Sequence, residues 1–245
     1  MCSSDLKSRI RILGDTGNFD IVITEIGGTV GDIEALPYIE SVRQLKWELE
    51  KDCMVVHLTL LPFLRVTGEL KTKPTQHSVK TMLESGVQPD VLVCRSEHAV
   101  DEDIRRKLAL FTNVRPRNVI ESRDASTIYE VPIMMYKEKL DEVVLDHFSM
   151  ESKTQPDLNR WKDFLSRLQY PKRTVEIGLI GKYVELKDSY KSITESFIHA
   201  GAANEVEVKV RWIHSENLSP KNATELCKGL DGILVAPGFG ERGFG

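Results

Sequence analysis

A carboxylate followed by closely spaced glycines is the segment of this chain best suited to chemistry. Residues 25–34 read EIGGTVGDIE and follow the apolar run 19–23. Apolar β-branched residues, then a carboxylate and three glycines, predict a buried strand that ends in a tight loop. Glycines can expose backbone N–H groups to an anion, and a carboxylate at a strand end can hold Mg²⁺ on a phosphate. We expect a nucleotide or phosphate site here, with Glu25 as the metal ligand; a capped turn without a ligand is the alternative.

A second segment, residues 68–78, combines two lysines with a helix start and reads GELKTKPTQHS. Pro74 suits the first position of a helix, which we predict over 75–85. Lys71 and Lys73 would then lie beside backbone N–H groups that lack a partner within the helix, and both features attract an anion. A solvated charged loop is the alternative.

The two motifs together resemble the CTP synthase family, in which a synthetase is joined to a class I glutamine amidotransferase, from about residue 14 to residue 245. The resemblance implies an α/β fold: a P-loop-NTPase-like (dethiobiotin-synthetase-like) parallel sheet, truncated at its N-terminus, then the first part of a flavodoxin-like amidotransferase domain. It implies that 1–148 is the C-terminal part of the synthetase domain, 149–173 a linker, and 174–245 the N-terminal part of the amidotransferase domain.

The resemblance also assigns roles to residues. For UTP and CTP binding it implies Asp32, Ile33, Glu34, Lys71, Thr72, Lys73, Pro74, Thr75, Gln76 and Lys107. For ATP binding it implies Arg123, Asp124 and Ala125. Gly238, in the terminal APGFGERG, matches the glycine whose N–H stabilises the oxyanion formed from glutamine. Glu25 matches a Mg²⁺ ligand, and the cysteine, histidine and glutamate of the glutaminase are expected beyond Gly245.

The implied activity is that of a ligase of pyrimidine biosynthesis, which aminates UTP to CTP with ATP, Mg²⁺ and ammonia from glutamine. The family also implies feedback inhibition by CTP, activation by GTP and a homotetramer. Since a phosphate-binding loop, a second acidic metal ligand and the glutaminase residues are missing, we expect the chain itself to be inactive. The alternatives are a catalytically dead nucleotide-binding or oligomerisation module, and another amidoligase, against which the KTKPTQ sequence argues.

Composition narrows the partners. The 245 residues carry a net charge of −4, with 41% hydrophobic and 29% charged residues. This balance gives no basic footprint for nucleic acid, and no segment has the roughly 18 apolar residues of a membrane helix. The four cysteines are far apart, without a C-x-x-C pair, which favours a reducing cytoplasm. Cys53 and Cys94 fall in apolar runs and are expected to be buried.

Periodicity and breakers predict the remaining elements. The predicted helices are 35–50, 75–85, 101–111, 129–148 with a break at Pro132, 158–168, 189–203 and 224–230. The predicted strands are 53–61, 90–95, 118–121, 174–183, 206–213 and 232–235. Asp32 and Glu34 are candidates to cap the first helix, Asp124 could cap a helix at 125–129, and His57 is expected to be a hydrogen-bonded core residue. The opening MCSSDL has no counterpart in the resemblance, so we expect residues 1–13 to be an artefact.

Overall fold

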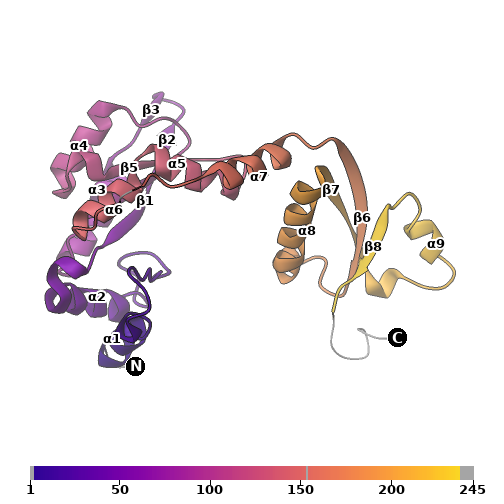
Figure 1. Cartoon of the computed structure of the whole chain (residues 1–245), viewed down its shortest axis with the longest axis horizontal. Helices are drawn as coiled ribbons and strands as arrows, with labels where there is room; N and C mark the ends of the chain where they lie inside the picture. The colour runs from indigo at the N-terminus through magenta and orange to yellow at the C-terminus, as the bar shows by residue number, and fades with distance from the viewer. Residues whose placement is uncertain (1–2, 153, 238–245) are drawn as a thin grey trace. The chain divides into compact units, whose positions relative to one another are not determined.

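The chain forms two compact units. A computed structural model describes residues 3–152 and 154–237 and divides between Gln155 and Pro156 (Figure 1). The part before this division is called unit 1, and the part after it unit 2. Among the described residues, no helix has the length and apolar character needed to cross a membrane.

Unit 1 is built on a parallel sheet in the strand order β1-β4-β5, and a short antiparallel pair, β2-β3, follows β1. Its helices are α1 (Ser3–Arg11), α2 (Leu36–Leu49), α3 (Lys73–Glu84), α4 (Glu102–Thr112), α5 (Val131–Lys137) and α6 (Leu140–His147). Its strands are β1 (Val56–Leu61), β2 (Phe63–Leu64), β3 (Glu69–Leu70), β4 (Val91–Ser96) and β5 (Val119–Arg123). Short 3-10 turns are η1 (Gly14–Thr16), η2 (Glu50–Asp52), η3 (Pro116–Asn118) and η4 (Ile128–Glu130).

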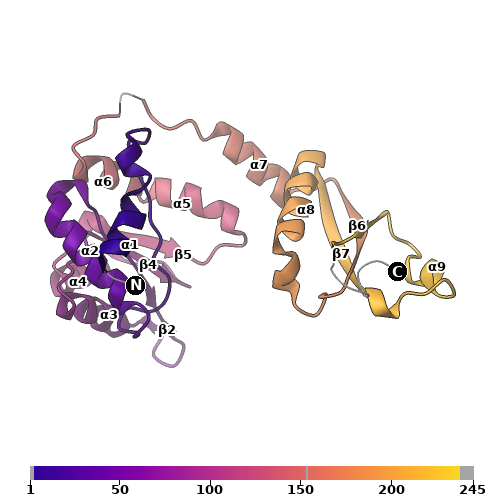
Figure 2. The same ribbon diagram turned by 90° about the horizontal axis from the view of Figure 1, so that it is seen from below.

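Helices pack on both faces of this sheet at β4 and β5, as expected for parallel strands. α3 and α4 pack on one face through a cluster that includes Val79, Leu92 and Leu108, all fully buried. α5 and α6 pack on the other face, around Val93 and Ile120 (Figure 2). Because β1, β4 and β5 are parallel, their carboxyl ends meet at one edge of this three-layered unit.

β1 lies at the edge of the sheet, and only one of its faces is covered. His57, Thr59 and Leu61 face α3 and are 5%, 8% and 1% exposed. The alternate side chains, Val56 among them, are exposed, with Leu58 at 66%. The expectation that His57 is a hydrogen-bonded core residue is confirmed, because its Nε2 lies 2.8 Å from Ser78 Oγ.

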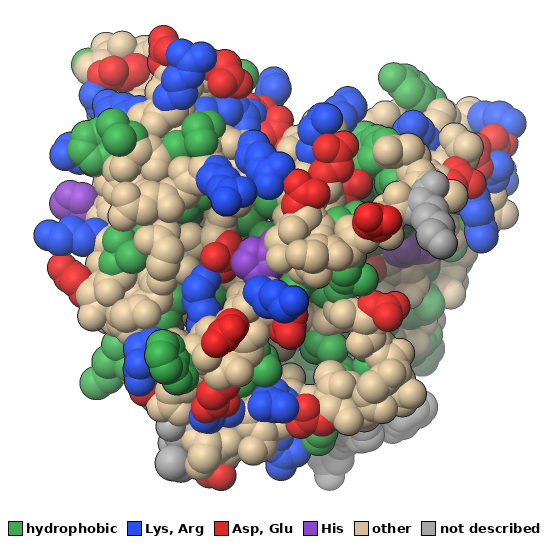
Figure 3. Space-filling view, turned by 60° about the vertical axis from the view of Figure 1, so that its left-hand side comes forward, with side chains coloured by type: hydrophobic (Ala, Val, Ile, Leu, Met, Phe, Trp, Pro, Cys, Tyr) green, Lys and Arg blue, Asp and Glu red, His purple; other side chains and the backbone are tan. Residues whose placement is uncertain are grey.

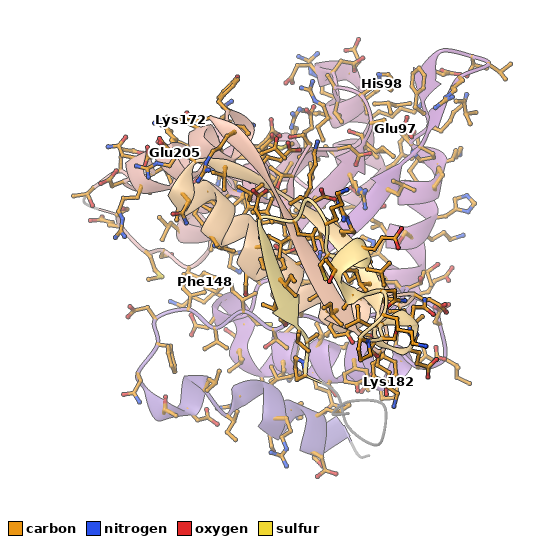
Figure 4. The ribbon with its side chains drawn as sticks, turned by 90° about the vertical axis from the view of Figure 1, so that its right-hand side faces the viewer. Glu97, His98, Phe148, Lys172, Lys182 and Glu205 are labelled. Atoms are coloured by element: carbon orange, nitrogen blue, oxygen red, sulfur yellow. The ribbon has the colours of Figure 1, made fainter. Side chains whose placement is uncertain are left out.

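Unit 2 contains a second parallel sheet, in the order β7-β6-β8. Its elements are α7 (Asn159–Gln169), β6 (Arg173–Gly181), η5 (Lys187–Tyr190), α8 (Lys191–Asn204), β7 (Val206–His214), η6 (Ser215–Asn217), α9 (Ala223–Leu226) and β8 (Gly232–Val235). α8 packs along β7, and α7 packs on α8. The side chains of Lys172, just before β6, and Glu205, just after α8, form an ion pair (Figure 4).

Gly181, at the end of β6, allows a close approach inside unit 2. A Cβ on this residue would lie 2.5 Å from the hydroxyl oxygen of Tyr190. That oxygen accepts a hydrogen bond from the backbone N–H of Tyr183 at 3.1 Å, and the Tyr190 side chain belongs to the core around Leu179. A side chain at position 181 would therefore displace a core tyrosine.

Most predicted helices and strands are confirmed with shifted ends, but the break in the helix predicted over 129–148 lies elsewhere. Pro132 falls in the first turn of α5, where its missing N–H costs nothing. The helix instead ends at Glu138 and Lys139, and Lys139 has a φ of 61°. A left-handed residue, rather than the proline, separates α5 from α6.

The strand predicted over 19–23 is wrong. These residues are in neither helix nor strand, and Ile23 is 91% exposed. A strand needs a hydrogen-bonding neighbour, and within the described residues β1 pairs only with β4. Ile21 and Val22 instead line, together with α2, an open cavity of about 480 Å³. An apolar β-branched run alone does not make a strand.

The opening residues, which were expected to be an artefact, take part in the fold of unit 1. Residues 3–11 form α1, which packs on α2. Leu6 is 7% exposed, and Lys7 forms an ion pair with Glu48 of α2. This segment contributes to the core and surface of unit 1 like the rest of the unit.

Candidate functional site

The lysine loop, residues 68–76, contains β3 and the first turn of α3, and only β2 and a turn separate it from the carboxyl end of β1. The backbone N–H of Lys71 donates to the carbonyl of Pro62 at 2.9 Å, which fixes the loop to the strand end. Lys73 and Pro74 form the first turn of α3, close to the predicted start. The two lysines therefore flank a helix N-terminus, where unpaired N–H groups and the helix dipole favour an anion.

Burial divides the predicted nucleotide ligands of this loop into two groups. Those with accessible side chains are Lys71, Lys73, Pro74 and Gln76. Thr72 and Thr75 are buried, at 5% and 0% exposed. The hydroxyl of Thr75 donates to the carbonyl of Leu60 at 3.2 Å, so its side chain is used inside the protein.

Lys107 of α4 contributes charge to the same region. The hydrogen bond from Lys71 lowers the pKa of Glu69, and Lys107 adds a smaller electrostatic effect in the same direction. Lys71 and Glu69 form an ion pair, whereas Lys73 forms none with the described residues. The structure thus brings Lys107, from a helix later in the chain, near Glu69 of the loop that carries Lys71 and Lys73.

Basic and acidic side chains are mixed on one face of the protein. On the face drawn in Figure 3, lysines and arginines alternate with acidic side chains instead of forming a broad basic surface. Such a distribution suits recognition of a small anion better than that of an extended polyanion.

The glycine segment, residues 25–34, forms turns before α2. Gly28 and Gly31 have φ values of 86° and 102°, as their predicted role in a tight loop requires. A Cβ on Gly31 would lie 3.0 Å from the methyl carbon of Thr81, so this segment touches α3. Glu25 is exposed and forms no hydrogen bond or ion pair with the described residues.

The three other predicted ligands of this segment, Asp32, Ile33 and Glu34, are exposed. The prediction that the two acids cap α2 is wrong, because this helix has Ala35 at its N-cap and no side-chain cap. Only the carbonyl of Asp32 contacts the helix start, by accepting from the Ala35 N–H at 3.0 Å. Both carboxylates therefore stay accessible to solvent.

The predicted ATP residues Arg123, Asp124 and Ala125 lie at the carboxyl end of β5. Asp124 does not cap a helix as predicted; Thr127 caps η4 instead. The Asp124 carboxylate accepts a hydrogen bond from Arg95 Nε at 2.9 Å, and the backbone N–H of Asp124 donates to the Ser96 carbonyl at 2.9 Å. Those two bonds hold the turn against the end of β4.

Arg95 was not among the predicted site residues. It is the exposed member of an otherwise buried strand, and its side chain brings a positive charge to the turn after β5. A cation at the carboxyl end of an apolar strand was the available signal. His98, which Figure 4 shows next to Glu97 on the loop after β4, packs against Phe63 with the ring centroids 3.9 Å apart and the planes tilted by 44°. That contact joins the end of β4 to β2, the strand that pairs with β3 of the lysine loop.

The predicted oxyanion residue, Gly238, lies outside the described residues. The strand that leads to it, β8, has the predicted bounds. The Ala236 N–H donates to the Ile180 carbonyl at 2.8 Å, which attaches the end of this strand to β6.

A Mg²⁺ site of protein ligands alone is absent from the described chain, where no three His, Cys, Asp or Glu side chains are grouped to hold a metal. Mg²⁺ bound to a nucleotide commonly uses one or two carboxylates, with phosphate and water as the other ligands. The exposed carboxylate of Glu25 fits this lesser role.

The fold and the candidate site together define a class of protein. The fold is that of an α/β protein, and a lysine-flanked helix N-terminus at the carboxyl ends of its parallel strands is an arrangement that favours an anion.

Comparison with known proteins is more specific. The family described as CTP synthase N-terminus matches residues 2–150, and the family described as glutamine amidotransferase class-I matches residues 185–245. The chain belongs to the CTP synthase family. Because the match begins at residue 2, the similarity also extends over α1.

Individual relatives agree. The chain is 63% identical over 242 residues to a CTP synthase of Christiangramia forsetii, and 61% to one of Flavobacterium johnsoniae. A CTP synthase of Bacteroides fragilis is 51% identical over 241 residues. These alignments cover 98% of this chain but 44%, 45% and 45% of the respective relatives. The chain therefore spans somewhat less than half the length of these relatives.

Proposed function

We propose that this chain is part of a ligase that aminates UTP to CTP, with ATP as the phosphoryl donor and glutamine as the source of ammonia. The lysine loop at the N-terminus of α3 carries this proposal, because it offers a triphosphate two ammonium groups and unpaired backbone donors at one place. Membership of the CTP synthase family supplies the choice of pyrimidine nucleotide.

In the proposed reaction, the uracil O4 of UTP takes the γ-phosphoryl group of ATP. Ammonia then adds at C4, and phosphate leaves with the former O4 oxygen. Lys71 and Lys73 hold the UTP triphosphate during both steps, and Lys107 reaches it from α4. Lys71 must then exchange Glu69 for phosphate. The lysines position a charged substrate; they transfer no proton in this scheme.

ATP is proposed to bind at the turn formed by Arg123, Asp124 and Ala125, where two bonds from Asp124 fix the backbone. Mg²⁺ bound with ATP would neutralise charge on the phosphoryl group being transferred. Glu25 would be one of its ligands, and nucleotide phosphates and water would supply the others.

Unit 2 is proposed to belong to the part of the enzyme that releases ammonia from glutamine, with the N–H of Gly238 in the oxyanion site. Inhibition by CTP at the UTP site, activation by GTP and assembly into a homotetramer complete the proposal for the whole enzyme.

Direct binding of UTP to this chain tests the proposal. Lys71→Ala and Lys73→Ala should each weaken UTP binding by about 10- to 100-fold, since a charge-assisted hydrogen bond contributes roughly 1.5–3 kcal/mol. Lys80→Ala is the matched control, because Lys80 is on the same helix and pairs with Glu84 at 3.8 Å. Calorimetric titration should show near wild-type affinity for this control. Equal affinities in all four proteins would remove the lysine loop from the UTP site.

A further inference from the structure

The contact between β1 and α3 in unit 1 is polar at its centre. Of the three β1 side chains that face the helix, Leu61 joins the apolar cluster with Val79, whereas His57 and Thr59 carry polar groups. Both polar residues are less than 10% exposed, at 5% and 8%. Buried polar groups must find partners within the protein.

Their partners are all on α3 or at the end of β1. The Thr59 hydroxyl donates to Thr75 Oγ1 at 3.1 Å, and the Thr75 hydroxyl donates onward to the Leu60 carbonyl at 3.2 Å. One turn further along α3, Ser78 Oγ lies 2.8 Å from His57 Nε2. We call these four side chains, His57, Thr59, Thr75 and Ser78, the hydroxyl seam.

The hydroxyl seam continues into the lysine loop. Thr75 is the third residue of α3, so fixing it also fixes the first turn, which contains Lys73. The Gln76 amide nitrogen donates to the Thr72 hydroxyl at 3.1 Å, and the Lys71 N–H donates to the Pro62 carbonyl. The loop is therefore held at two points: at Lys71 to Pro62, the residue that follows β1, and at Thr75 to β1 itself.

Stability alone does not require a polar seam. Replacing both partners of a buried hydrogen bond with apolar groups of the same shape is nearly neutral, and valine has the shape of threonine. An apolar contact has no preferred direction, so the helix could shift along the strand without losing it. Hydrogen bonds between hydroxyl groups depend on distance and angle, and they are therefore compatible with only one register of the helix on the strand.

We propose that the hydroxyl seam is a positioning device, which sets the register of α3 on β1 and thereby places Lys71, Lys73 and Gln76 for a nucleotide triphosphate. Thr75 then acts through the seam and not by touching the ligand. The inference rests on the proposed UTP site, and it concerns buried residues that position this site without contacting the nucleotide.

The test uses the whole chain and a set of threonine variants. Thr75→Val and Thr59→Val should each weaken UTP binding by about tenfold or more, which corresponds to one hydrogen bond's contribution to the site geometry. Thr75→Ser keeps the hydroxyl and should bind UTP within about twofold of wild type. In Thr59→Val/Thr75→Val, an apolar pair replaces the hydroxyl pair, so the midpoint of thermal unfolding should recover while UTP affinity stays low.

Several outcomes overturn the inference. If Thr59→Val binds UTP normally and Thr75→Val does not, Thr75 contacts the ligand directly. If Thr75→Ser loses as much affinity as Thr75→Val, packing of the methyl group matters and the hydroxyl does not. If the double variant regains affinity together with its thermal stability, the seam serves stability only.

A measurement without ligand separates this inference from the proposed function. Amide hydrogen exchange at Lys71 and Gln76 should become faster in Thr59→Val than in wild type, while exchange within α4 stays the same. Unchanged exchange in the loop contradicts the seam even if UTP binds. A wild-type chain that is folded but does not bind UTP contradicts the proposed function instead, and the exchange comparison still decides the role of the seam.

Discussion

The lysine loop and the glycine segment were both predicted to bind the nucleotide, yet they differ in how the structure supports them. The lysine loop is bonded to β1 and continues into a helix whose buried face reaches the core. The glycine segment follows an exposed, irregular run, and Glu25 has no partner among the described residues. It meets the rest of unit 1 through Val30 and Gly31, beside α3.

This difference shows what a loop needs in order to become a site. Judged by residue types alone, both segments were similarly good candidates for a nucleotide site. The lysine loop gains definite geometry because its anchoring strand, β1, is paired with β4. The run 19–23 has equally good strand residues but no strand beside it in the described chain.

The largest expected contrast concerns the core below the lysine loop. Leu92→Ala removes a fully buried side chain from β4 and should lower the free energy of unfolding by about 2–5 kcal/mol. Ile23→Ala, in the exposed run, should change it by no more than about 0.5 kcal/mol. Urea unfolding of the two variants checks this. A comparable loss in Ile23→Ala would show that the run 19–23 is packed in solution.

A smaller effect is expected from His57, because burial lowers the pKa of its imidazole below 6.5. The folded chain then resists protonation that the unfolded chain accepts, so stability is complete above pH 6.5 and falls as the pH decreases below it. One group gives a slope of at most about 1.4 kcal/mol per pH unit.

The comparison protein for this prediction is His57→Gln, which can keep a hydrogen bond to Ser78 but does not titrate. Denaturant unfolding between pH 7 and pH 5 should show a steeper loss in wild type than in the variant. Parallel stability curves would mean that His57 takes up no extra proton on unfolding.

The smallest effect concerns the helix that carries Lys107. The Asp101 carboxylate caps α4 by accepting from the Ile104 N–H at 2.8 Å. Asp101→Ala should therefore cost about 1 kcal/mol of stability, whereas Asp101→Asn or Asp101→Ser should preserve most of it. Thermal unfolding of the three variants gives the order. A loss in Asp101→Asn equal to that in Asp101→Ala would assign the effect to charge instead of capping.

The sequence was a good guide wherever local signals decided the outcome. The Pro74 helix start, the strands β4 and β8 and the buried His57 were all predictable, because breakers and apolar periodicity act over a few residues. Prediction failed where distant partners decide. The Asp124 carboxylate accepts a hydrogen bond from Arg95 and does not cap a helix. For residues 19–23, the neighbouring sequence does not reveal whether another strand lies beside them.

The site shows the same division. The accessible lysines were predictable from charge beside a helix start. The burial of Thr75 depends on Thr59 and Leu60, fifteen or more residues earlier, and only the fold brings them together. The charge of Lys107 near Glu69 likewise follows from the packing of α4 beside α3.

The most direct test of the central claim is a titration of the isotope-labelled chain with UTP, followed through its backbone amide NMR signals. The account predicts the largest shifts in the lysine loop and around Lys107, and little change over 19–23 or in unit 2. Shifts confined to unit 2, or no shifts at millimolar UTP, would contradict the assignment of the lysine loop as the nucleotide site.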